Sequence, residues 1–262
     1  MGMIKRMLCM LLVICMLCAP ALAEEGGIGL LLELTGRLVK MFDQESSPDP
    51  YLWMFEQETT DASIDDLPEV AQMLRDLGID EITEQVEDNY RKMTEEVMLL
   101  MSQHGNEYTI SREQMILGLL YTAGSEQRRE NGCVYAFDAE VYESETMYRD
   151  FLKGIERIGN GELKFDNITE NLSGVDPETG DGTRTVTFDF KGETITYEAL
   201  AQHDWFDAGM LGFMHEVIGT GESGRQLYVV FDGMQGVVLF YQTPQWARAF
   251  TKATNCPLFT GM

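Results

Sequence analysis

The sequence of 262 residues predicts an α+β protein, in which an N-terminal helical layer or small bundle precedes a mostly antiparallel sheet with interspersed helices. Two patterns indicate this fold class. Before residue 125, apolar side chains recur at every third or fourth position, the period of an amphipathic helix. After residue 131, short segments alternate apolar and polar residues between turn sequences, which is typical of hairpin-linked strands. We therefore divide the chain into a signal segment (1–23), a helical region (24–130) and an α+β domain (131–262).

The N-terminal segment has the layout of a secretory signal. Lys5 and Arg6 precede an apolar run, and the small residues Ala21 and Ala23 follow it. The run falls short of the roughly 20 residues that a membrane span needs. We expect cleavage after Ala23 and a secreted or extracytoplasmic protein without stable membrane insertion.

The helical region is predicted to begin near residue 27. One helix, capped by Asp61 or Ser63, ends at Gly78, and a longer helix follows with Asp80 as its expected N-cap. A third helix opens with a capping box of Ser111 and Gln114 and runs to residue 124. The longest helix carries one apolar stripe: Ile82, Val86, Tyr90, Met93, Val97 and Met101.

The α+β domain is predicted to contain hairpin-linked strands with helices between and after them. A strand near 133–141 precedes a helix over about 145–158, and a strand at 183–190 turns through Lys191 and Gly192 into the next strand. Residues 226–231 and 236–241 form a second expected hairpin. Thr243 and Pro244 are an N-cap and first residue for the last helix.

Residues 201–217, "AQHDWFDAGMLGFMHEV", hold two of the three histidines. We expect a helix with Asp204 as N-cap and Asp207 at its third position. His203 and His215 would then lie about 18 Å apart, too far to share a metal ion, and His215 would face solvent. His203 and Asp207 alone lack the further ligands that a metal site needs.

The charge of the chain excludes some partners. The sequence has 44 acidic and 19 basic side chains and a formal net charge of −25. Such a surface repels nucleic acid, because it has no basic patch to displace the counterions of phosphates. Solubility outside the cell is the favoured interpretation, and a cationic ligand or divalent ions are the alternative.

Cys133 and Cys256 are the cysteines that remain after the signal segment. A disulfide between them and two free thiols are both compatible with the sequence. A nucleophilic pair of Cys133 and His203 is a weak hypothesis, because the segment "NGCVYAF" lacks a cysteine-hydrolase signature.

Metal and cofactor motifs are also weak. Asp176, Glu178 and Asp181 could bind calcium, but their spacing differs from that of a calcium loop and favours a hairpin turn. The glycine-rich residues 219–224 follow a helix and lack the lysine of a phosphate-binding loop. We expect no cofactor.

Aromatic residues gather in the last third of the chain, and Trp205, Tyr241 and Trp246 are candidates for a binding groove. The leading hypothesis is a secreted, non-catalytic module that binds a protein or a cell-envelope ligand. One alternative is an extracellular hydrolase that uses His203 with Cys133 or a carboxylate pair. The other is a structural or inhibitory module.

Overall fold

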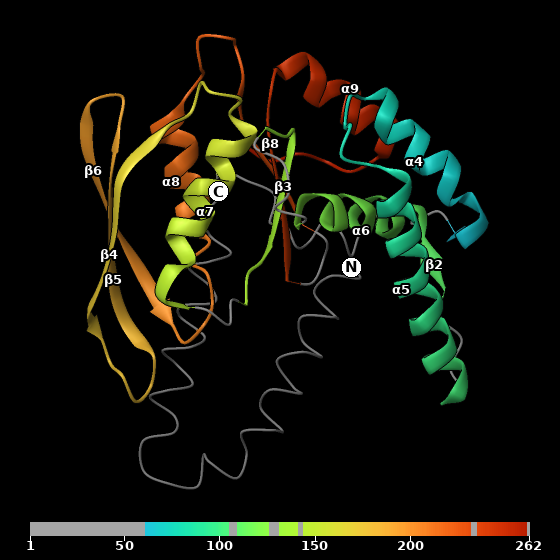
Figure 1. Ribbon diagram of the computed structural model, residues 1–262, viewed down its shortest axis with the longest axis horizontal. Coiled ribbons are helices and arrows are strands. Elements are labelled where there is room, and N and C mark those ends of the chain that lie inside the picture. The colour runs from blue at the N-terminus through green and yellow to red at the C-terminus, as the bar shows by residue number, and fades with distance from the viewer. Residues whose placement is uncertain (1–60, 105–108, 126–130, 141–143, 232–234, 261–262) are drawn as a thin grey trace, which may run out of the picture. The chain divides into compact units, whose positions relative to one another are not determined.

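The computed structural model describes residues 61–104, 109–125, 131–140, 144–231 and 235–260, all within a compact unit that spans Asp49–Met262. The signal segment and the helix expected from residue 27 lie outside these residues. The described residues form six α-helices and three antiparallel sheets, which confirms the α+β class (Figure 1). None of the described helices combines the length and the apolarity that crossing a membrane requires.

Three helices follow one another in the first described part of the chain. They are α4 (Leu67–Asp76), α5 (Glu84–Gln103) and α6 (Arg112–Ser125), accompanied by a 3-10 turn, η2 (Ile64–Asp66), and a short pair of strands, β1 (Asp61–Ala62) and β2 (Ile110–Ser111). Ser63 caps the 3-10 turn with a complete capping box. The Ser111–Gln114 box is confirmed: the Gln114 N–H donates to Ser111 Oγ at 3.1 Å, and the Ser111 N–H donates to Gln114 Oε1 at 2.9 Å.

The predicted start of α5 was wrong. Thr83 is the N-cap, because its backbone is extended and its Oγ1 accepts the N–H of Val86 at 3.3 Å. Asp80 lies in the connecting turn, where the chain is still held by the buried side chains of Ile79 and Ile82. A threonine that fits the backbone geometry therefore takes the place expected of an aspartate.

A central sheet joins the two halves of the chain. Its order is β3 (Val134–Asp138), β8 (Gly236–Gln242) and β7 (Gln226–Phe231), all antiparallel. One face, with Val134, Val230 and Phe240, packs on the helices α4 to α6 and forms with them a first hydrophobic cluster. The other face packs on a second hydrophobic cluster, which includes Phe151, Phe188 and Met214. Burial on both faces explains why β7 and β8 are continuous apolar runs and not alternating ones.

An outer sheet forms the opposite side of the second cluster. Its order is β4 (Phe165–Val175), β5 (Asp181–Phe190) and β6 (Glu193–Gln202). The expected alternation is confirmed in β5, where Val186, Phe188 and Phe190 are buried. Lys191 and Gly192 both have positive φ, at 51° and 84°, as a two-residue hairpin turn requires.

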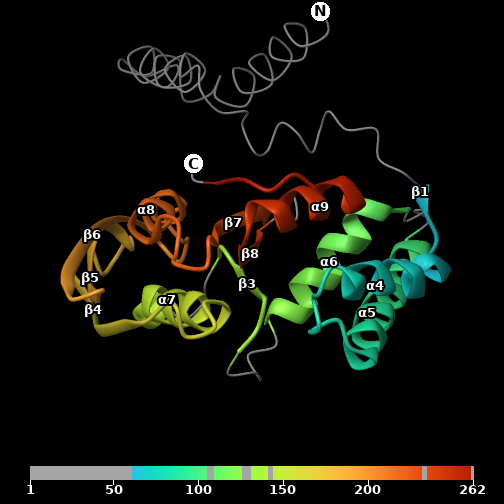
Figure 2. The same cartoon turned by 90° about the horizontal axis from the view of Figure 1, so that it is seen from above.

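The remaining helices fill the space around the central sheet. They are α7 (Met147–Ile158), α8 (Gly209–Ile218) and α9 (Pro244–Thr254). Figure 2 shows the helices α4 to α6, the central sheet, the pair α7 and α8, and the outer sheet in succession. The prediction of α9 is confirmed, with Thr243 Oγ1 accepting the N–H of Trp246 at 3.3 Å. Side chains on both sides of residue 130 share the first cluster, and the division at that residue stays a prediction.

Candidate functional site

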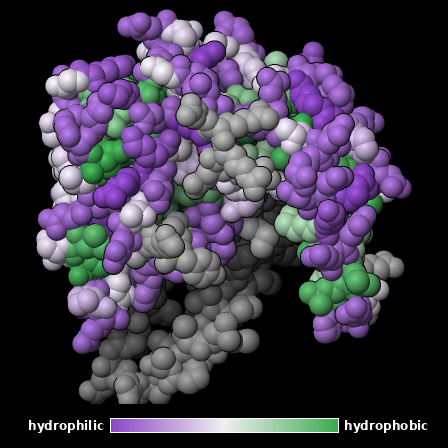
Figure 3. All heavy atoms as spheres, in the orientation of Figure 1, coloured by the Kyte–Doolittle hydropathy of each residue, from purple (hydrophilic) through white to green (hydrophobic). Residues whose placement is uncertain are grey.

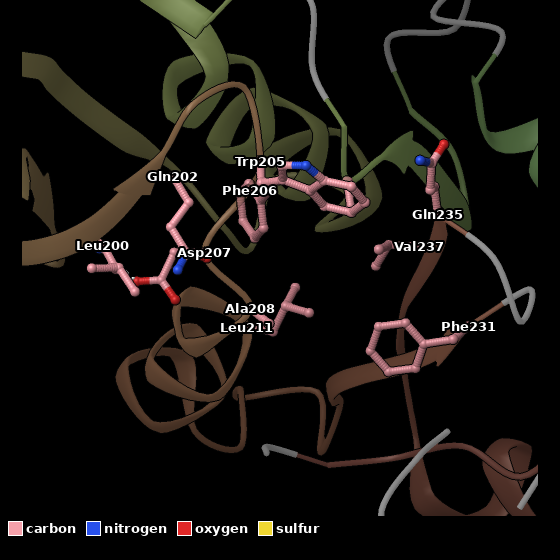
Figure 4. Close-up of a pocket in the computed structure, with 11 residues that line it drawn as sticks. Leu200, Gln202, Trp205, Phe206, Asp207, Ala208, Leu211, Phe231, Gln235 and Val237 are labelled. Atoms are coloured by element: carbon pink, nitrogen blue, oxygen red, sulfur yellow. Dashed lines mark hydrogen bonds between the residues drawn. The ribbon is translucent and has the colours of Figure 1, made fainter. Parts of the chain in front are cut away.

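A pocket of about 320 Å³ opens where the end of β6, the continuation of β3 and the β7–β8 hairpin meet. Figure 4 shows the indole of Trp205 lying between Gln202 on one side and Gln235 on the other, with Phe231 and Val237 across from it. Most of the lining is apolar, and the polar groups are two amides and the carboxylate of Asp207. A concave apolar pocket with a few polar groups is the usual form of a binding site.

The expected helix start at Asp204 was wrong. Residues 203–207 form a loop tied to its neighbours by backbone hydrogen bonds, from His203 N to Gly180 O at 3.1 Å and from Phe206 N to Ala139 O at 2.7 Å. Trp205 pairs with both Gln202 and Glu140 through isolated β-bridges. These strand-like bonds hold the backbone out of the helical conformation, and α8 begins only at Gly209.

Asp207 fixes this loop to β6 and to α8. Its Oδ2 accepts the hydroxyl of Tyr197 and the N–H of Leu200, both at 2.9 Å, and its Oδ1 accepts the N–H of Gly209 at 2.9 Å. Its own N–H donates to the Tyr148 hydroxyl at 3.2 Å. Burial, together with the Asp207 carboxylate, raises the pKa of Tyr197. Both carboxylate oxygens are therefore occupied in holding the wall of the pocket.

Trp205 and Phe206 divide two roles between them. Phe206 is buried against Phe137, Tyr148 and Phe151, with ring centroids 4.7–5.1 Å away. Trp205 is 43 % exposed, and Leu200, on the same pocket, is 53 % exposed. The loop is thus anchored by one aromatic ring while it presents the other to solvent.

A buried ion pair lies behind the anchored loop, and sequence reasoning missed it. Arg184 Nη1 is 3.1 Å from Glu170 Oε2, with side-chain exposures of 4 % and 1 %. The guanidinium stands 5.5 Å from the ring centroid of Tyr148, whose pKa burial raises to about 12. The signal was present in β5, because Arg184 has the same parity as the buried Val186. An inward arginine demands a buried acidic partner.

The other two aromatic candidates lie away from this pocket. Tyr241 is buried in β8, and burial followed by the neighbouring Glu162 raises its pKa. Trp246 packs on Phe240 and Phe250 and donates its indole N–H to Leu77 O at 2.7 Å, so it anchors α9 to the end of α4. Of the three, only Trp205 lines the pocket.

Cys133 and His203 have separate surroundings. The Cys133 thiol donates to Glu81 Oε2 at 2.9 Å, and burial, followed by the charge of Glu81, raises its pKa. A nucleophilic thiolate needs the opposite environment. His203 is exposed at the end of β6, with φ of 55°. No hydrogen bond within the described residues joins the two, so the geometry gives the hydrolase hypothesis no support.

Both described cysteines are free thiols, so the structure has no disulfide between Cys133 and Cys256. Cys133 is held by Glu81, and Cys256 is buried beyond α9, where its Sγ lies 3.5 Å from Thr254 O. His215 also differs from the expectation: its Nδ1 lies 3.2 Å from Leu227 O, so it faces β7 and not solvent.

In the acidic turn between β4 and β5, the carboxylate of Asp176 and the backbone N–H of Asp181 form local hydrogen bonds. Asp176 Oδ1 accepts the N–H of Glu178 at 2.8 Å, and the Asp181 N–H donates to Thr179 Oγ1 at 3.3 Å. Gly180 supplies the positive φ of 71°. These are the bonds of a turn. Across the described segments, no three His, Cys, Asp or Glu side chains are grouped so as to hold a metal ion.

Comparisons with family models, with curated proteins and with solved structures found no match to this chain. The geometry of the Trp205 pocket is therefore the basis for a function.

Proposed function

We propose that this protein is a secreted, non-catalytic binding module that captures an apolar side chain of a protein or cell-envelope partner in the Trp205 pocket. The observation that carries the proposal is the pairing of an exposed Trp205 with an exposed Leu200 on one concave surface. Exposed apolar side chains that line a hollow are typical of contact sites. The signal pattern at the N-terminus supports the location outside the cytoplasm.

The support of the loop favours binding over catalysis. Asp207 makes three hydrogen bonds through its carboxylate, and Phe206 is buried, so the pocket wall is held in place before a ligand arrives. A prearranged site loses less entropy when it binds. A catalytic acid or base needs a carboxylate or imidazole with an open position, and both oxygens of Asp207 are occupied.

The size of the pocket fits one large side chain. Burying one aliphatic or aromatic side chain contributes about 1.5–3 kcal/mol. A short peptide is therefore expected to bind with a dissociation constant of millimolar order or weaker. Tight binding would need further contacts from a larger partner around this anchor.

Titration by nuclear magnetic resonance tests the proposal. Serine-rich peptides with a central Leu, Phe or Ala are added to the labelled protein, and the indole N–H signal of Trp205 is followed. We expect saturable shifts with Leu and Phe and none with Ala, and loss of the response in Trp205→Ala, measured on the backbone signals of Leu200.

A matched control separates binding at this site from nonspecific binding to exposed apolar side chains. Leu99 on α5 is also strongly exposed but lines no part of the pocket, so Leu99→Ala should keep the response. Equal loss in both variants, or no response to any peptide, would overturn the proposal. Turnover of a peptide, ester or glycan panel that Cys133→Ala abolishes would support the hydrolase instead.

A further inference from the structure

We infer that the segment captured by the Trp205 pocket is cationic, with its apolar side chain flanked by lysine or arginine. This inference rests on the proposed function and adds the chemistry of the partner. Three observations support it: the carboxylates around the pocket, the pairing of the buried Arg184 with Glu170, and the cationic lining of two other pockets.

Three carboxylates belong to the pocket or border it. Asp207 is part of the lining, and Asp204 precedes Trp205 in the chain. Glu140 is joined to Trp205 by a β-bridge, and its Oε2 accepts the amide of Gln235, a lining residue, at 2.6 Å. The described lining contains no lysine, arginine or histidine.

The buried arginine that packs on Tyr148 does not offset these charges. Arg184 lies behind Tyr148, almost fully buried, and its ion pair is with Glu170. The partners of the Asp207 carboxylate are a phenol hydroxyl and two backbone N–H groups, which carry no net charge. The pocket wall is therefore negative, and a concave apolar surface concentrates such a field.

The acidic lining is not a uniform consequence of the net charge. A second pocket, of about 470 Å³, has Arg248 and Lys252 in its lining. A third, of about 430 Å³, has Lys153, Arg157 and Lys164. Cationic side chains thus reach other hollows of this acidic protein, while the Trp205 pocket has one carboxylate and no cation.

The exposed indole adds an attraction for the same ligands. An ammonium or guanidinium group over an indole ring is held by about 0.5–1 kcal/mol at an exposed site. We therefore expect the apolar side chain to enter the pocket beside Trp205 and the neighbouring cation to lie over the face of the indole ring. Glutamate or aspartate at the same flanking positions would meet Glu140 and Asp204 as like charges.

The test uses three peptides with the same central leucine and with flanks of lysine, serine or glutamate, titrated at physiological ionic strength. Charges more than ~8 Å away are largely screened there, so the difference among peptides reports the local carboxylates. We expect the lysine peptide to bind about tenfold more tightly than the glutamate peptide, with the serine peptide between them.

Matched variants assign the preference to residues. Glu140→Gln with Asp204→Asn should reduce the tenfold preference for lysine over glutamate to about twofold. Glu95→Gln with Glu96→Gln, on α5, changes the net charge equally and should leave it unchanged. If the serine peptide binds through Trp205 and lysine gives no advantage, the inference fails and the proposed function stands. If no peptide binds, both fail.

Discussion

Asp207 shows how one residue can shape a site without taking part in chemistry. Three donors converge on its carboxylate, from β6 and from the first turn of α8. The sequence predicted Asp207 at the third position of a helix capped by Asp204, but the helix begins at Gly209, whose N–H donates to Asp207 Oδ1. The bonds from Tyr197 and Leu200 connect elements that no local pattern brings together.

Replacing Asp207 with alanine should lower the free energy of unfolding by about 2 kcal/mol, because the Tyr197 hydroxyl and two N–H groups lose their acceptor. Urea denaturation measures the change. Asp204→Ala is the matched control and should alter stability by less than about 0.5 kcal/mol. Similar losses for both would contradict the role of Asp207 as the fixing residue.

Asp189, on the outer sheet, gives a prediction that depends on pH. Hydrogen bonds from Thr194, at 2.7 Å, and from Asn167, at 2.6 Å, lower the pKa of Asp189 below its ordinary value. The stabilisation it gives is present above the ordinary pKa and is lost as the pH falls through the lowered one. Thr194→Val should raise the pKa of Asp189, followed through its carboxyl carbon signal. An unchanged titration would show that Thr194 has no such effect.

Helix α5 has two halves with different surroundings. Val86, Tyr90 and Thr94 are buried. The ring of Tyr90 packs against Gly118 of α6 and leaves no room for a Cβ at that position. Met93 and Val97 of the predicted stripe are exposed, and so are Leu99 and Leu100 nearer the C-terminal end of the helix. Figure 3 shows a hydrophobic cluster near the free end of α5. A side chain at position 118 would collide with the Tyr90 ring, so the packing of α5 on α6 requires a glycine there.

The two halves of α5 should respond differently to truncation. Tyr90→Ala should lower the free energy of unfolding by about 3–4 kcal/mol, because it leaves a cavity against α6. Leu100→Ala, at a position that is 56 % exposed, should cost less than about 0.5 kcal/mol. Denaturation curves compare the two. A large loss for Leu100→Ala would show that another surface covers this half of the helix.

Elements with a clear period could be predicted, and those set by long-range bonds could not. Helices α4 to α7 and α9 and the two hairpins follow from apolar spacing, caps and turn residues. Residues 205–207 were assigned to a helix capped by Asp204, but backbone hydrogen bonds from His203 to Gly180 and from Phe206 to Ala139 hold this segment as a loop. No local pattern reveals those partners.

At the scale of the molecule, the pocket depends on segments far apart in the chain. Its lining comes from Ala139, from side chains between Leu200 and Leu211, and from Phe231, Gln235 and Val237. The central sheet brings them together, because β3 pairs with β8 about a hundred residues later in the chain. The sequence could name Trp205 as a candidate, but it could not show that Tyr241 and Trp246 pack against interior side chains away from the pocket.

Photo-crosslinking tests the central claim most directly. A serine-flanked peptide with a diazirine-bearing leucine at its centre is irradiated with the protein, and mass spectrometry maps the attached residues. Crosslinks to Leu200, Trp205 and Phe231 are the predicted result. Crosslinks concentrated on Leu99 and Leu100 of α5, or scattered over the surface, would contradict the assignment of the Trp205 pocket as the binding site.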